Sequence, residues 1–214
     1  MNLKRLLDDI SSVSLANVFN PYRDVCDSYD CPKAPVIRRK NLLHYLESIQ
    51  EAETESLWMG RDLGYRGGRR TGLALTDEFH MEKFHLVFPT SKMHRATTGE
   101  VVKERTATEI WNVLFSLNLN PMLWNVFPFH PHEPNNPMSN RKFSAKELSV
   151  AEQLNSELIT ALGIKTIVAI GNDAEAYSKR FGVKVIKVRH PSYGGTAEFR
   201  KGIRDYYHCS TVGS

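Results

Sequence analysis

The apolar positions of this chain switch between helical spacing and short continuous runs, a pattern that predicts helices alternating with buried strands. Residues 36–51 show the helical spacing, and residues 56–60 form an apolar run that stops at a glycine-rich loop. The same two patterns recur to the end of the chain. They predict further strands at 83–88, 122–127, 166–170 and 184–188, and further helices at 110–117, 145–162, 174–181 and 197–207, while residues 1–15 have the pattern of a short amphipathic start.

Two of the expected helices begin with the pattern of a capping box, in which a Ser or Thr and a Glu three residues later bond each other's backbone amides. The two segments are Thr106–Glu109 and Ser144–Glu147. Residues 17–36 differ from both, because they are rich in Asp, Pro, Tyr and Asn. We expect an irregular segment there that wraps around the fold.

This order of elements predicts an α/β fold, a three-layer α/β/α sandwich with a short, mainly parallel central sheet. In such sheets, ligands bind beyond the carboxyl ends of the strands. Three unusual loops follow three of the expected strands, and we expect them to converge on one site. They are GRDLGYRGGRR from Gly60, NVFPFHPHEP from Asn125 and RHPSYGG from Arg189.

The length of 214 residues fits one domain over 1–214, with 1–35 as the N-terminal wrapping segment and 56–207 as the core. Hydrophobic residues make up 41% and charged residues 24%, which excludes a disordered, collagenous or coiled-coil chain. No apolar run approaches the about 18 residues that span a bilayer, and the N-terminus does not resemble a secretory signal, so no membrane contact is expected. Three cysteines are too few and too odd a number for a disulfide scaffold, so we expect a cytoplasmic location.

The charge of the chain permits nucleic-acid binding without requiring it, since 28 Lys and Arg against 24 Asp and Glu give a net charge of +4. The placement of the charge is more informative. Arg66, Arg69 and Arg70 cluster beside glycines, and Arg189 begins another basic stretch that contains glycines. A solvated surface is the ordinary explanation for such clusters. A glycine backbone, however, lets a phosphodiester approach closely, which favours contact with nucleic acid.

Each of the three loops also holds one polar residue that packing explains poorly. Asp62 follows a buried strand and lies between glycines, where it caps a helix, pairs with an arginine or activates a water. Asn125 lies in an apolar strand, so its amide needs partners, either in a neighbouring loop or on the edge of a base-like ligand. His190 is held by the proline that follows it, and it is either structural or catalytic.

Neither a metal nor an organic cofactor is expected. His130 and His132 suggest a metal site but lack a third ligand at a sensible spacing. Cys26, Cys31 and Cys209 lack the fourth thiolate that a four-iron cluster requires.

Taken together, the three loops resemble those of the uracil-DNA glycosylase superfamily. The ordered set is GRDLG, LWNVFPFHPH and RHPS, within residues 56–207. The resemblance implies an α/β/α sandwich that acts on DNA, flips a nucleotide out of the duplex and hydrolyses its N-glycosidic bond without a cofactor. No lysine lies in the three loops to form a Schiff base, so we expect a monofunctional glycosylase, acting as a monomer without an obligate protein partner.

The resemblance also implies roles for individual residues. Asp62 matches the acid that activates water, Asn125 matches the amide that reads the base, and His190 matches the group that stabilises negative charge on O2 of the leaving base. Tyr193 stands near the residue that the family inserts into the duplex as a wedge, which is a Leu in the uracil-specific branch. The implied DNA contacts are Ser192, Tyr193, Gly194 and Gly195, together with the basic residues Arg66, Arg69, Arg70 and Arg189.

Two departures from the uracil-specific branch concern the base pocket. Gly64 stands where that branch has a Tyr that blocks substituents at C5, and Leu75 stands where it has a Phe that stacks on uracil. Unless Tyr65 or Trp124 fills the space, this predicts a pocket open at C5, with Asn125, Gly64, Tyr65 and Leu75 contacting the base. Because an amide can present either face, both uracil and a cytosine such as glucosylated hydroxymethylcytosine fit Asn125.

Several functions stay open. Within the glycosylase interpretation, the role is either repair of deaminated cytosine or defence against phage DNA that carries bulky modified bases. A DNA-binding module that has lost the chemistry is an alternative, although the joint presence of Asp62, Asn125 and His190 disfavours it. A hydrolase of free nucleosides is a further alternative, which the basic clusters beside glycines disfavour.

Overall fold

A four-stranded parallel sheet lies at the centre of the protein, in the strand order β3-β2-β5-β6. The structure is a computed structural model that describes residues 3–211, with side chains as far as residue 208. The parallel sheet confirms the predicted fold class. The strands are β2 (Ser56–Asp62), β3 (Met122–Phe127), β5 (Thr166–Ile170) and β6 (Lys184–Val188).

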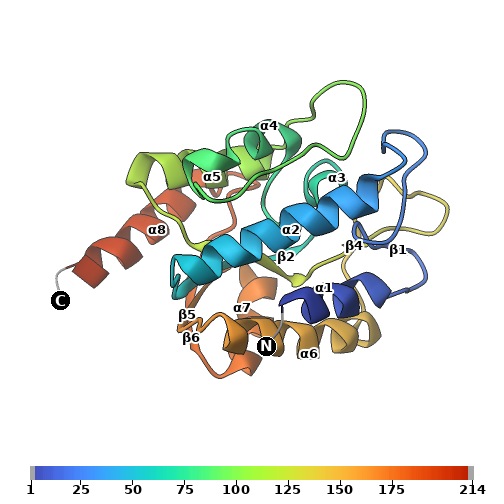
Figure 1. Cartoon of the computed structure of the whole chain (residues 1–214). Coiled ribbons are helices and arrows are strands. Elements are labelled where there is room, and N and C mark those ends of the chain that lie inside the picture. Colours follow the sequence, from blue (N-terminus) through green and yellow to red (C-terminus); the bar gives the residue numbers. More distant parts are fainter. Residues whose placement is uncertain (1–2, 212–214) are drawn as a thin grey trace.

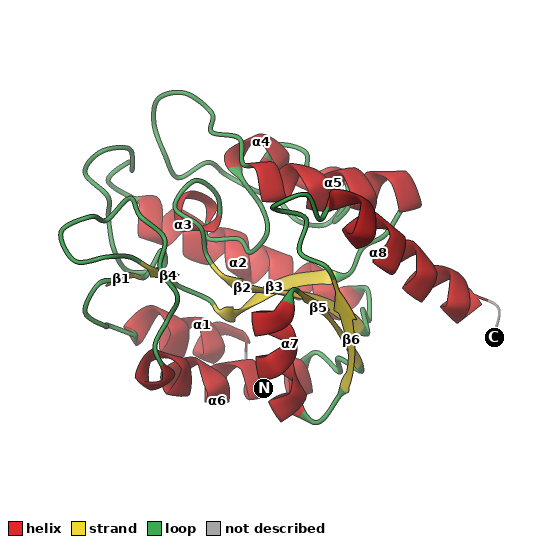
Figure 2. Cartoon of the chain, turned by 180° about the vertical axis from the view of Figure 1, so that it is seen from behind, coloured by secondary structure: helices red, strands yellow, loops and turns green. Residues whose placement is uncertain are grey.

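Helices cover both faces of this sheet, which gives the three layers of the predicted sandwich (Figure 1). In Figure 2, α2, α5 and α8 lie above the sheet, and α1, α6 and α7 lie below it. None of the helices within residues 3–211 has both the length and the apolar character needed to cross a bilayer. The bounds are α1 (Leu3–Ser12), α2 (Ala34–Glu51), α5 (Arg105–Leu117), α6 (Ala145–Ala161), α7 (Asn172–Ser178) and α8 (Thr196–Thr211).

The remaining elements are short. A two-stranded antiparallel ladder joins β1 to β4, so the N-terminal segment is tied to the loop that follows β3. These elements are β1 (Val18–Phe19), α3 (Gly68–Thr71), α4 (Glu78–Met81), the 3-10 turns Phe84–Leu86 and Lys179–Phe181, and β4 (His130–Pro131).

The central strands are mostly apolar because the sheet is covered on both faces. All six residues of β3 are buried, as are four consecutive residues of β2. Trp58 of β2 packs edge-on against Phe199 of α8, with the ring centroids 6.1 Å apart. This core holds the sheet rigid, and it aligns the ends of β2, β3 and β5 at one edge.

One of the predicted helix starts is confirmed and the other is wrong. The Ser144 side chain accepts a hydrogen bond from the Glu147 backbone at 3.2 Å, and Glu147 accepts one from the Ser144 backbone at 2.6 Å, which is a complete capping box. The other helix, α5, begins before the predicted box, at Arg105, and has no side-chain cap. Glu109 does not cap it and instead forms an ion pair with Arg200.

The strand predicted at 83–88 is wrong as well. Phe84 and Phe88, four residues apart, both pack against Tyr45, with ring centroids 5.1 and 5.0 Å away. The 3-10 helix Phe84–Leu86 turns the chain so that both rings lie on the same side. Residues 83–88 belong to neither of the two sheets described. The alternation of apolar and polar residues at 83–88 therefore comes from a turn that packs Phe84 and Phe88 against Tyr45.

Within the N-terminal segment, residues 17–33 are largely irregular, as predicted for 17–36, and α2 begins at Ala34. Polar contacts hold it against the fold. The Asn20 amide donates to the backbone oxygens of Ile10 and Val13, and the Tyr22 hydroxyl donates to Gly72 O at 2.7 Å. A fully buried ion pair joins Asp30 to Arg38 of α2. The segment is therefore a structural part of the fold, and it packs behind the loop that follows β2.

Candidate functional site

A cavity of about 710 Å³ opens at the carboxyl ends of the parallel strands. Asp62 at the end of β2, Asn125 in β3 and His190 after β6 all line it. The structure therefore brings the three loops together at one cavity, as predicted. A fourth wall comes from the turn after β5, where Gly171 has a φ of +90° and a Cβ there would lie 3.3 Å from His190 Cβ.

Asp62 presents a nearly buried carboxylate to this cavity, with its side chain 9% exposed. Arg61 Nε lies 2.7 Å from its Oδ2, so the arginine pairing weighed for this residue is present. Burial raises the pKa of Asp62 to about 6, against the opposing effect of Arg61 and with a further push from Asp173. The carboxyl group is therefore mostly ionised at neutral pH, and it can orient a water molecule and take its proton.

Asn125 is 1% exposed, and neither its Nδ2 nor its Oδ1 has a hydrogen-bond partner among the described residues. The neighbouring-loop partner considered for this amide is absent there. Leaving a buried polar group unpaired costs about 1–3 kcal/mol, so an orphaned amide that faces a cavity indicates a ligand with a matching edge. Gly60 makes room for it, because a Cβ there would lie 2.4 Å from Asn125 Oδ1 and 2.9 Å from Leu75 Cδ2.

His190 has its tautomer set by the residue two positions on. The Ser192 backbone N–H donates to Nδ1 at 3.1 Å, and the Ser192 hydroxyl lies 2.7 Å from the same atom. Because a backbone amide only donates, Nδ1 accepts, and the proton of the neutral ring lies on Nε2. Burial lowers the pKa of His190, helped by the positive charges of Arg61 and Arg189. The ring is therefore neutral at physiological pH and offers an Nε2–H donor.

The residues predicted to contact a base divide into two groups. Gly64 and Leu75 line the cavity, whereas Tyr65 does not, and its backbone N–H donates to Asn140 Oδ1 at 3.1 Å. Trp124 does not fill the space either, since it is 2% exposed and its indole N–H donates to Asn155 Oδ1 at 2.8 Å in the core. The part of the cavity beside Gly64 is therefore not closed by either aromatic side chain.

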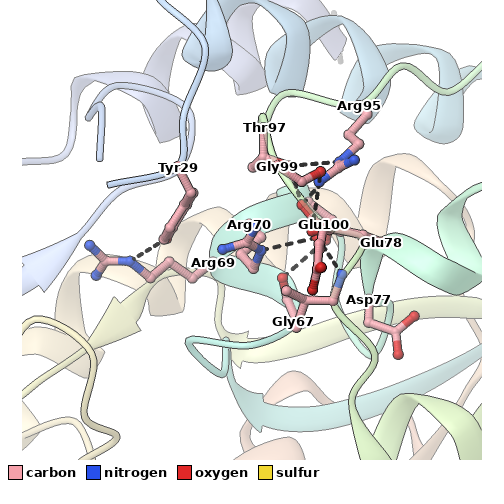
Figure 3. A network of polar contacts seen from close by, with 12 residues as sticks. Tyr29, Gly67, Arg69, Arg70, Asp77, Glu78, Arg95, Thr97, Gly99 and Glu100 are labelled. Carbon is pink, nitrogen blue, oxygen red and sulfur yellow. Dashed lines mark hydrogen bonds and ion pairs between the residues drawn. The ribbon is translucent and has the colours of Figure 1, made fainter. Parts of the chain in front are cut away.

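Arg69 and Arg70 are buried, which corrects the prediction that they contact DNA. Arg69 is 3% exposed; it donates to the Tyr29 hydroxyl at 2.8 Å and stacks on Phe19, 3.8 Å from the ring centroid. Arg70 lies 3.2 Å from Glu78 and over the Tyr29 ring (Figure 3). The N-terminal segment covers both guanidinium groups, so they brace the fold instead of facing solvent.

Arg66, in the same loop, is exposed, and the loop after β6 is exposed at its tip. Tyr193 is 96% exposed and lines the mouth of the cavity, with a left-handed φ of 52°. Gly195 packs so closely under this turn that a Cβ there would lie 2.2 Å from His190 O. Arg189 and Ser192 line the cavity, while Gly194 and Gly195 form the turn beside it.

His130 is occupied by the protein at both ring nitrogens. Arg69 donates to Nδ1 at 2.8 Å, and Nε2 lies 2.8 Å from Ser139 O. Burial lowers the pKa of His130 to about 3, and the Arg69 charge adds to this effect. This ring is therefore a neutral structural group that links the N-terminal segment to the loop after β3.

Two residues that line the cavity, Arg61 and Glu104, were not among the predicted site residues. Arg61 connects Asp62 to Asp173, with its Nη1 3.6 Å from the second carboxylate. Glu104 reaches the cavity from the residue before α5, and burial raises its pKa to about 7, with further repulsion from Asp77. Arg61 stands inside the first loop, where its place beside Asp62 was visible, but Glu104 arrives from a distant segment.

No protein-family model matches the sequence, and no curated protein sequence matches it. The structure, however, is similar to the crystal structure of wild-type SMUG2 from Pedobacter heparinus. The TM-score is 0.63 at 15% sequence identity, and the match covers 98% of this chain and 96% of that one. A wild-type UNG structure from Nitratifractor salsuginis matches with a TM-score of 0.43 at 13% identity, over 94% of this chain and 93% of that one. The likeness to SMUG2 shows that the two chains share a fold, and it agrees with the α/β/α sandwich predicted from the sequence.

Proposed function

We propose that this chain is a monofunctional DNA glycosylase, which takes a pyrimidine nucleotide out of the DNA stack and hydrolyses its N-glycosidic bond. The observation that carries the proposal is the orphaned amide of Asn125, which faces the same cavity as Asp62 and His190. An amide with an unpaired donor and an unpaired acceptor suits the pairing edge of a base. The likeness to SMUG2 in fold supports the proposal.

The residues present suit the charge that develops during cleavage. Breaking the bond between C1′ of the sugar and N1 of the base leaves positive charge on the sugar and negative charge on the base. The Asp62 carboxylate favours the first charge, and it orients a water whose oxygen adds to C1′ and whose proton it accepts. The His190 Nε2–H donates to the O2 atom of the leaving base and favours the second charge.

Access to the base requires that the nucleotide leave the duplex, which costs a few kcal/mol. Tyr193, at the mouth of the cavity, is the side chain we place against the base stack. The phosphates on either side would meet Arg66, Arg189 and Ser192, with the backbone of Gly194 and Gly195. We propose that the protein makes these contacts as a monomer in the cytoplasm, without a cofactor.

The base is proposed to be uracil or a pyrimidine with a bulky C5 substituent, such as glucosylated hydroxymethylcytosine. A cavity of about 710 Å³ is larger than a single pyrimidine ring needs, and Gly64 leaves its wall open. The two bases imply different roles, since uracil indicates repair and a glucosylated base indicates defence against modified phage DNA.

Base release from a panel of DNAs, with alkali to cleave abasic sites, tests the proposal. The panel holds uracil, mismatched thymine, hypoxanthine, hydroxymethylcytosine and its glucosylated form. We expect release of at least one pyrimidine, abolished in Asp62→Asn while DNA binding persists. DNA binding without base release from any member of the panel would leave the DNA-binding module as the function.

A further inference from the structure

Glu104 places a carboxyl group in the cavity wall, where Gly67 of the loop after β2 makes room for it. A Cβ on Gly67 would lie 2.5 Å from Glu104 Oε2, so a larger residue there would displace the carboxyl group. A Cβ on Gly64 would lie 3.7 Å from Glu104 Oε1, so these two residues border the same part of the cavity.

No hydrogen bond or ion pair reaches this carboxyl group from the residues that the structure describes. The backbone N–H of Glu104 donates to Asp77 Oδ2 at 2.6 Å, which brings a second acid close to this residue. Burial and Asp77 both raise the pKa of Glu104, while Arg66 opposes them. Glu104 is only partly buried, but a ligand that fills the cavity would exclude solvent from its carboxyl group, so that ligand has to supply a donor. None of the catalytic steps above uses Glu104.

Chemistry limits which part of a bound nucleotide could donate a hydrogen bond to Glu104. A carboxylate repels phosphate, so Glu104 is unsuited to the DNA backbone. A pyrimidine carries its polar groups on the pairing edge, which Asn125 and His190 already take in the proposed function. The opposite edge of an unsubstituted pyrimidine has only carbon-bound hydrogens at C5 and C6, and C6 adjoins the glycosidic nitrogen. A donor that reaches Glu104 must therefore be carried on a substituent at C5.

We propose that Glu104 is a specificity-determining residue that accepts a hydrogen bond from a hydroxyl group on the C5 substituent of the flipped pyrimidine. This inference rests on the proposed glycosylase function. It assigns the substrate class as pyrimidines with a hydroxylated C5 group, which includes hydroxymethyl and glucosylated hydroxymethyl bases.

Pairs of bases that differ by one hydroxyl test the inference. The kcat/KM for base release is compared between 5-hydroxymethyluracil and thymine in the same mismatch, and between hydroxymethylcytosine and methylcytosine. Glucosylated hydroxymethylcytosine extends the series. A hydrogen bond to a carboxyl group that is partly ionised at neutral pH predicts that the wild type favours the hydroxylated member by about 10-fold. In Glu104→Ala this preference falls toward one, and Glu104→Gln, whose amide oxygen still accepts, recovers part of it.

Glu100→Gln is the matched control, because it removes an exposed acid from the same segment of the chain. It is expected to keep the wild-type preference. An unchanged preference in both Glu104 variants would overturn the inference and leave the glycosylase function standing. The same holds if the variants slow release from both members of a pair equally, or if the wild type releases only uracil. Failure of the wild type to release any base would instead overturn the proposed function itself.

Discussion

Two loops that combine arginine with glycine border the cavity, and their arginines have opposite surroundings. In the loop after β2, Arg69 and Arg70 turn inward and stack on aromatic rings of the N-terminal segment. In the loop after β6, Arg189 is about half exposed, and Tyr193 projects from the tip. Both loops have the composition of a phosphate-binding loop, but in the first loop the N-terminal segment covers Arg69 and Arg70 and leaves Arg66 exposed. Whether an arginine contacts DNA or braces the fold thus depends on what covers it.

The largest expected difference between the loops is in stability. Arg69→Ala removes the hydrogen bonds to Tyr29 and His130 and the stacking on Phe19, and it leaves two buried polar groups without a partner. We expect the free energy of unfolding to fall by about 3 kcal/mol, measured by urea denaturation. Arg66→Ala, from the same loop but exposed, should change it by no more than about 0.5 kcal/mol. Equal effects of the two substitutions would remove the distinction drawn between the arginines.

The next effect concerns the tip of the loop after β6. Tyr193→Ala should slow base release about 5- to 150-fold, because stacking of a base on an aromatic side chain contributes about 1–3 kcal/mol. Single-turnover release measures this effect, and the urea midpoint should not move because the side chain packs against nothing in the fold. Tyr193→Phe keeps the ring and should stay near the wild-type rate. A Tyr193→Ala enzyme as fast as the wild type would exclude a role for this ring in holding the flipped state.

The smallest expected effect concerns the contribution of Arg189 to DNA affinity and to the salt dependence of that affinity. Arg189→Ala should weaken DNA binding and lower the slope of log affinity against log salt by about one, since one phosphate contact is lost. Arg5→Ala, which removes the same charge from exposed α1, is the control and should leave the slope unchanged. If both variants alter the slope alike, the effect comes from net charge and not from a contact of this loop.

The parts of the site that could be predicted are those encoded by short neighbouring stretches. Asp62 and His190 come at or just after the end of a strand and Asn125 lies near the end of one, and parallel strands bring such positions to one edge of the sheet. The capping box at Ser144 is equally local. These elements need no knowledge of distant contacts.

The parts that were missed depend on contacts between distant segments. Arg69 is buried because Phe19 and Tyr29 cover it, and its own neighbours in the sequence contain no sign of that. Phe84 lies in a turn because its ring packs against Tyr45. Glu104 enters the cavity through its backbone contact with Asp77 and through the space at Gly67. In each case the determining partner lies many positions away.

The pH dependence of base release tests most directly whether Asp62 performs the hydrolysis in this cavity. Burial raises the pKa of this group to about 6, and only the ionised form orients and deprotonates water. We therefore expect the single-turnover rate to rise about tenfold per pH unit below that value and to level off above it. Asp62→Asn should abolish both the release and its pH dependence while DNA binding persists. A pKa of about 6 predicts a rise in rate of about 30-fold between pH 4.5 and pH 8, so a rate that stays flat over this range would contradict the assignment of Asp62.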